Sequence, residues 1–222
     1  MFCAECGNEI MAGTTSCNQC GARTSSASPS QAAERIRSRS RDAFRVVKTI
    51  VANPVGGLST AYQSLEKRQA LEVGLLFGAV SEICVVVGLY LFLPRWAGTP
   101  DFGEIVKILI LGVVPFAAIA GASFAARKIF RAPGGSIESD VFIGGISLLP
   151  QSLVVLLAGI LGYANLEVVA IAAVFALSYT ILILHAGCVR ISGISEAGAA
   201  PAVPMVILIS AWLSKITFSA ML

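Results

Sequence analysis

Long apolar stretches dominate the chain after residue 70, and polar residues gather before it. Five stretches are apolar enough to cross a bilayer, which takes about 20 consecutive apolar residues. They are residues 71–93, 105–126, 141–161, 168–188 and 202–218. Pro115 and Pro150 do not exclude spanning helices, because neighbouring helices satisfy the freed backbone groups. The pattern predicts an all-α integral membrane protein whose residues 70–222 form a five-helix transmembrane bundle.

The segment before the first apolar stretch, residues 42–69, has the period of cytosolic interfacial amphipathic helices. Its apolar face includes Val47 and Ile50 and is expected to dip into the membrane surface. Asn53-Pro54 ends the first of these helices, because a residue before proline avoids the α conformation. Residues 23–41 are rich in Ser and Arg and predict a flexible basic linker.

Charge is scarce and unevenly placed. Charged residues make up 13% of the chain, whereas about 25% is usual in soluble domains. Of the 16 Lys and Arg residues, 13 lie before the first predicted span or in the loops after the second and fourth. Because such residues favour the cytosolic side, the N-terminus is expected inside and the C-terminus outside. No apolar leader follows the first methionine, so no cleaved signal peptide is expected.

The basic residues before the first span are expected to contact anionic lipid headgroups at the cytosolic face. They are Arg35, Arg37, Arg39, Arg41, Arg45 and Lys48. The alternative is that they serve only to set the topology. Nucleic-acid binding is not expected, because no aromatic residues are interleaved with the charges and a membrane segment follows.

Two Cys-x-x-Cys-Gly turns lie at the N-terminus, one holding Cys3 and Cys6 and the other Cys17 and Cys20. Two intervening residues let both thiolates of a pair reach one ion, and four thiolates select zinc, with iron as the soft-ligand alternative. All four positions of a tetrahedron would be protein ligands, so the site is structural. Residues 1–22 are therefore predicted to be a four-cysteine zinc ribbon with one Zn²⁺ per chain.

The middle of the predicted bundle carries polar side chains. Glu82 lies halfway along the first apolar stretch, and Gln151 and Tyr179 fall at similar depth. An ionisable group there is costly and usually faces a partner or a cavity. One interpretation is a site that responds to protons, ions or lipid headgroups. The other is a protonated Glu82 that holds helices together through a hydrogen bond to Gln151 or a hydroxyl.

Small residues recur at four-residue spacing and predict close helix packing, within the bundle or between protomers. The repeats are Gly74 with Gly78, Ala117 with Gly121 and Ala125, and Ala172 with Ala176. A homo-oligomer is therefore one expectation.

Met1–Gly21 resembles the zinc-ribbon heads of many bacterial membrane proteins. The rest, about residues 44–222, resembles the Yip family of Rab-interacting membrane proteins. This resemblance rests on the cytosolic head, Asn53-Pro54, the five spans and the Gly144–Pro150 stretch of the third span. It implies trafficking or membrane shaping in eukaryotes. The zinc head favours a prokaryotic source, and hence the bacterial cytoplasmic membrane.

These features favour a non-enzymatic membrane scaffold or adaptor of the Yip type, with a protein partner for the zinc ribbon. The alternative is a small transporter or channel for ions, protons or lipids that uses Glu82 and requires a water-filled path lined by Glu82, Gln151 and Tyr179. An enzyme is not expected, because the single histidine, His185, has no carboxylate near it in sequence.

Overall fold

A computed structural model describes residues 3, 6–9, 17–21, 44–50, 53–92, 101–161 and 165–221. The chain divides into two compact units, Met1–Arg41 and Asp42–Leu222. The predicted linker, with its arginines at positions 35, 37, 39 and 41, lies outside the described residues.

The second unit is helical. Residues 44–50 form a helical segment, and the helices that follow are α2 (Pro54–Gln63), α3 (Lys67–Phe92), α4 (Phe102–Ile129), α5 (Ile137–Leu161), α6 (Leu166–Ala186) and α7 (Glu196–Met221). A π-helical turn, η3 (Gly187–Ile191), extends α6. The long helices confirm the five predicted spans, since five are long and apolar enough to cross a membrane. The protein is an integral membrane protein of the all-α class.

Capping extends α4 beyond its apolar run. The Asp101 side chain accepts a hydrogen bond from the Glu104 N–H at 2.8 Å, and the Glu104 carboxylate accepts one from the Asp101 N–H at 3.1 Å. This reciprocal capping box satisfies two backbone donors at the helix start. Asn53 performs a similar role at α2, where its side-chain oxygen accepts from the Gly56 N–H at 2.8 Å and Pro54 follows as the first helical residue.

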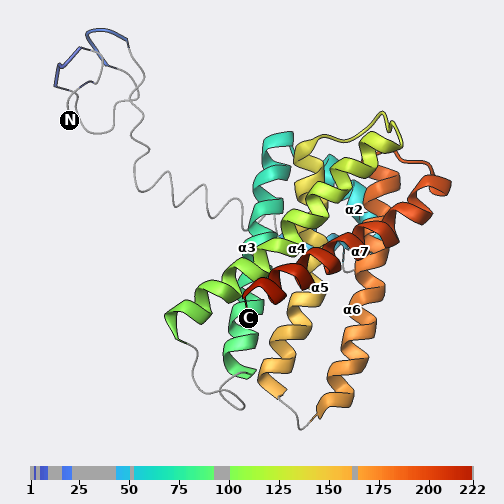
Figure 1. Ribbon diagram of the computed structural model, residues 1–222. Helices are drawn as coiled ribbons and strands as arrows, with labels where there is room; N and C mark the ends of the chain where they lie inside the picture. Colours follow the sequence, from blue (N-terminus) through green and yellow to red (C-terminus); the bar gives the residue numbers. More distant parts are fainter. Residues whose placement is uncertain are drawn as a thin grey trace. The chain divides into compact units, whose positions relative to one another are not determined.

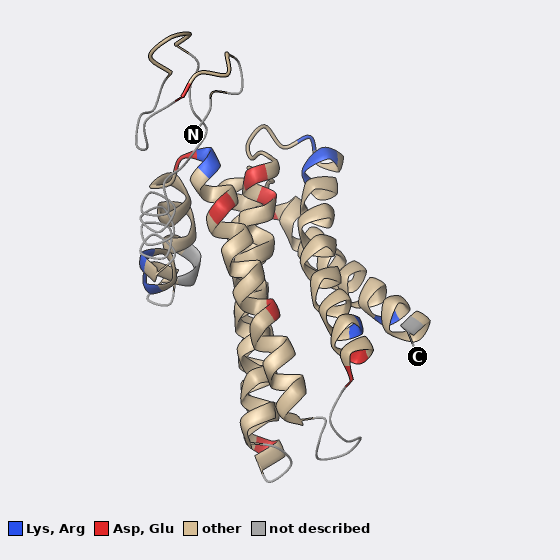
Figure 2. Ribbon diagram, turned by 90° about the vertical axis from the view of Figure 1, so that its left-hand side faces the viewer, with Lys and Arg blue, Asp and Glu red and all other residues tan. Residues whose placement is uncertain are grey.

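The helices of this unit lie in layers (Figures 1 and 2). α3, α5 and α6 run side by side, and α4 and α7 pack together across one face of this row. α2 packs against α6 and η3 on the other face. α5 is central, because it contacts α3, α4 and α6.

Glycines bring the backbones of α3 and α5 into direct contact. A methyl group at Gly145 of α5 would overlap the carbonyl oxygen of Gly74 on α3, and one at Gly159 would overlap that of Gly88. Both pairs are 14 residues apart in the same chain direction, so the two helices run parallel with a two-heptad repeat. A repeat of seven residues is typical of helices that supercoil around each other. At these glycine positions a side chain would collide with the backbone of the facing helix.

The small-residue stripe predicted on α4 does not pack within the described part of the chain. Ala117, Gly121 and Ala125 are not buried, whereas the alanines one position later in each turn are. A methyl group at Gly121 would meet no atom within 4 Å. The hydropathy of a spanning helix is similar all round, so the sequence did not reveal which stripe faces the bundle.

The helical segment 44–50 packs against the helices of the membrane unit with part of its apolar face. Val46 and Ile50 are buried in the main core, and the Tyr179 hydroxyl donates a hydrogen bond to the Ile50 carbonyl oxygen at 2.9 Å. Arg45 and Lys48 lie outside this core, and both are more accessible than Val46 and Ile50. The apolar residues that were expected to dip into the membrane therefore include some that hold this segment against α6.

The glycine contact predicts a contrast between two similar substitutions. Gly145→Ala should lower the free energy of unfolding by about 1–3 kcal/mol, the usual cost of overpacking a tight core. Gly121→Ala, at an open position of α4, should leave it unchanged or raise it slightly. Thermal unfolding of both variants in the same detergent measures the difference. Equal unfolding temperatures would contradict the assigned packing.

Candidate functional site

The four N-terminal cysteines converge on one point. The Sγ atoms of Cys3 and Cys20 are 3.6 Å apart, as are those of Cys6 and Cys17, and all four lie within 4.8 Å of one another. Metal–sulfur bonds of about 2.3 Å in a tetrahedron place sulfurs about 3.8 Å apart. The cluster could therefore hold a metal ion, and all four predicted ligands contribute to it.

Each cysteine pair closes a turn that ends in glycine. The Gly7 N–H donates to the Cys3 carbonyl oxygen at 2.8 Å, and the Gly21 N–H donates to that of Cys17 at 2.9 Å. Both glycines have positive φ, 71° and 70°, a conformation that side chains disfavour. The two turns are copies of one backbone motif, which explains why the sequence repeats the same spacing.

The turns also shape the acidity of the thiols. The backbone N–H groups of Cys20 and Gln19 lower the pKa of the Cys17 thiol to about 6. The Asn8 N–H acts in the same sense on Cys6, but the neighbouring cysteine sulfurs, that of Cys20 above all, raise the pKa of the Cys6 thiol to about 12. Four sulfurs this close cannot all be thiolates without a cation. Metal binding must therefore release protons.

A second candidate site is a half-open cavity of about 320 Å³ between the five long helices. All five long helices contribute to its wall. Aliphatic side chains dominate this wall, and they include Val85, Ile119, Leu148, Val155, Leu177 and Ile207. Glu82 and Gln151 also line the cavity, so the structure brings two of the three predicted intramembrane polar residues together.

Glu82 has an unusual setting in this cavity. Its Oε1 atom and the Ser81 hydroxyl are buried without a hydrogen-bond partner in the described part of the chain. A methyl group at Gly112 of α4 would overlap both carboxylate oxygens of Glu82, so the carboxylate rests directly on the α4 backbone. No hydrogen bond joins Glu82 Oε1 to Gln151 among the described residues, and Tyr179 lies outside the cavity, bonded to Ile50.

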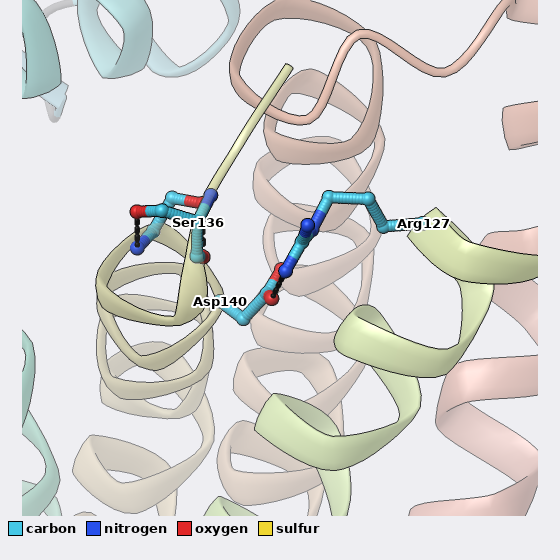
Figure 3. A network of polar contacts seen from close by, with 4 residues as sticks. Arg127, Ser136 and Asp140 are labelled. Atoms are coloured by element: carbon cyan, nitrogen blue, oxygen red, sulfur yellow. Dashed lines mark hydrogen bonds and ion pairs between the residues drawn. The ribbon is translucent and has the colours of Figure 1, made fainter. Parts of the chain in front are cut away.

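A buried ion pair joins the ends of α4 and α5 (Figure 3). Arg127 Nη2 donates to Asp140 Oδ2 at 2.8 Å, and their side chains are only 11% and 2% exposed. Ser136 caps α5 beside the pair, where its hydroxyl oxygen accepts a hydrogen bond from the Ser139 N–H at 3.4 Å. The sequence showed Arg127 only as a charge that sets topology. Its position 13 residues before Asp140, across a turn, was the signal that could have revealed the pair.

Because the ion pair is buried, a conservative substitution in it should strongly lower the free energy of unfolding. Asp140→Asn leaves a buried guanidinium without its counter-charge, which should lower the free energy of unfolding by about 3–5 kcal/mol. The double variant Arg127→Met/Asp140→Leu should lose less, because it removes both charges. Glu196→Gln, at an exposed position of α7, is the control. Unfolding in detergent measures all three, and an Asp140→Asn variant as stable as the control would contradict the role of the pair.

The fold and the two sites define the class: an integral membrane protein with five candidate spans and a separate four-cysteine cluster able to bind a metal ion. Comparisons with protein-family models, curated proteins and solved structures found no match for this chain. The resemblance to the Yip family stays a prediction, carried by the residues quoted for it.

Proposed function

We propose that the chain is a non-enzymatic membrane adaptor of the Yip type, with its zinc ribbon in the cytosol and its C-terminus outside the bacterial cytoplasmic membrane. The observation that carries this proposal is the separation of the chain into two units. The four cysteines belong to Met1–Arg41, and the spans belong to Asp42–Leu222. A small metal-folded unit tethered to a membrane domain is suited to docking a protein partner at the membrane.

The docking surface of this unit is the pair of cysteine turns. Asn8, Asn18 and Gln19 are exposed, and the Asn8 amide donates to the Gln19 side-chain oxygen across the two turns. Zinc is the ion proposed, because four thiolates in tetrahedral reach select it. Since so small a unit has little core, the ion would supply its folding free energy. Arg45 is exposed in the membrane unit, as is Lys48, which supports their contact with anionic headgroups.

The adaptor proposal is tested on the full chain with a photo-crosslinking amino acid at Asn18. Elemental analysis should find one zinc per chain, and Cys3→Ser should lose both the zinc and any crosslinked protein while still inserting in the membrane. Cys84→Ser, a cysteine outside the cluster, should keep both. Wild-type protein purified without chelator that lacks zinc, or a crosslink that survives Cys3→Ser, would contradict the proposal.

We infer a second candidate, a small transporter or channel, from the cavity. The structural interpretation has Glu82 bonded to Gln151 or a hydroxyl, but Glu82 Oε1 has no hydrogen-bond partner among the described residues. Glu82 also lines a space reached by all five spans. An unpaired carboxylate at this depth is a common feature of ion and proton paths. Tyr179 does not contribute to that space, so a path would involve Glu82 and Gln151 alone among the predicted residues.

Glu82→Gln separates the two candidates. In sealed vesicles with an enclosed pH-sensitive dye, the wild type should pass protons or ions in a pH-dependent manner under the transport proposal. Glu82→Gln keeps the size but removes the titratable proton, so the flux should fall to the level of empty vesicles. Glu167→Gln, an exposed acid of α6, should behave as wild type. Wild-type flux equal to that of Glu82→Gln would eliminate the transporter.

A further inference from the structure

Among the polar groups of the cavity, the Gln151 amide and the Ser81 hydroxyl can donate hydrogen bonds, whereas other hydroxyls of the wall have used their protons. The hydroxyls of Thr180, Ser152 and Ser214 donate their protons to backbone carbonyl oxygens of Ser147, Leu149 and Ser210, at 3.0, 2.9 and 2.8 Å. A hydroxyl that has given its proton to the backbone has only lone pairs left for a ligand. Three of the hydroxyls on the cavity wall are therefore acceptors toward its interior.

The cavity wall contains one acidic side chain, Glu82, and no basic side chain among its described residues. Glu82 lines it with an unpartnered buried oxygen, and no Lys, Arg or His is among the described lining residues. A carboxylate in apolar surroundings is strongly disfavoured unless a counter-charge or a hydrogen-bond donor accompanies it. The Ser81 hydroxyl, 4% exposed and also unpartnered in the described part of the chain, lies beside it on the same wall. What the site lacks is a donor that carries positive charge.

The rest of the wall selects against a bare metal ion. Hard cations take several oxygen ligands, whereas most of this wall is aliphatic. Its volume of about 320 Å³ is at the lower end for pockets that bury a small organic molecule. A compact hydrocarbon body would fill the aliphatic part, and one ammonium group would meet Glu82.

We propose that this cavity binds a compact lipophilic amine, with its ammonium group on Glu82 and its hydrocarbon body between the aliphatic side chains. The inference rests on the same cavity as the second proposed function, but it does not require transport. Gly112 matters to it, because only a glycine lets the Glu82 carboxylate lie against α4 at the cavity wall.

The probe is 1-adamantylamine, with the neutral 1-adamantanol as its matched control of equal shape. Binding to the full chain in nanodiscs is measured by calorimetry at neutral pH, where the amine is protonated. The wild type should bind the amine at least about tenfold more tightly than the alcohol, a difference of about 1.4 kcal/mol. Glu82→Gln should abolish this preference, whereas Glu167→Gln should keep it. Equal binding of the two probes by the wild type would overturn the proposal.

A second variant tests the volume independently of the charge. Ala211 lines the cavity at an exposed position of α7, so Ala211→Leu should fold and should weaken the amine and the alcohol alike. Amine binding that is unchanged in both Glu82→Gln and Ala211→Leu would place the probe in lipid and refute the site. If added sodium displaces the amine competitively, the site is a metal-ion site and the proposal fails.

Transport is read separately in the vesicle assay. Selective amine binding without flux would support the amine site and remove the transporter. Flux that depends on Glu82 without selective amine binding would support the transporter and refute the amine site. The two proposals can therefore fail independently.

Discussion

The direct contact between the backbones of α3 and α5 is the constraint on which the membrane domain depends. Lipid tails are as apolar as leucine, so spanning helices gain little from hydrophobic burial and associate mainly through close packing. Gly74 with Gly145 and Gly88 with Gly159 supply that packing at two levels. The other spans build on this pair, since α4 and α6 pack on α5 and α7 packs on α4.

This contact also fixes where α3 presents its polar residues. At about 100° of rotation per residue, Glu82 lies about 80° around the helix from Gly74. Once the glycine face is committed to α5, Glu82 is turned toward α4, where Gly112 leaves room for its carboxylate. The cavity is thus a consequence of how α3 is anchored. A change in the glycine contact would move Glu82, the only charged residue type among the described lining residues.

The sequence predicted features that follow from composition and local spacing, and it missed features that depend on helix rotation. The five candidate spans and the four-cysteine cluster could be predicted because an apolar run and a Cys-x-x-Cys turn are each local. The sequence indicated the wrong face of α4, the stripe containing Gly121, as a packing face. A helix that is apolar all round has no period that marks its buried face. Gly74 was recognised, but its contact with Gly145 depends on a helix much later in the chain. The docking of Tyr179 on Ile50 joins residues even further apart.

A comparison of two carboxylates of the membrane domain shows why the missing partner of Glu82 is informative. Asp140 is buried and Glu82 is half-buried, and the chain provides Arg127 at 2.8 Å from Asp140 to compensate its charge. Glu82 receives no such cation among the described residues, although α4 approaches closely enough that a side chain at position 112 would clash with it. The residue on α4 that meets the carboxylate is a glycine, which admits the charge without neutralising it. A group held in this way has to be compensated by a proton, by water or by a bound cation, so its state depends on what enters the cavity.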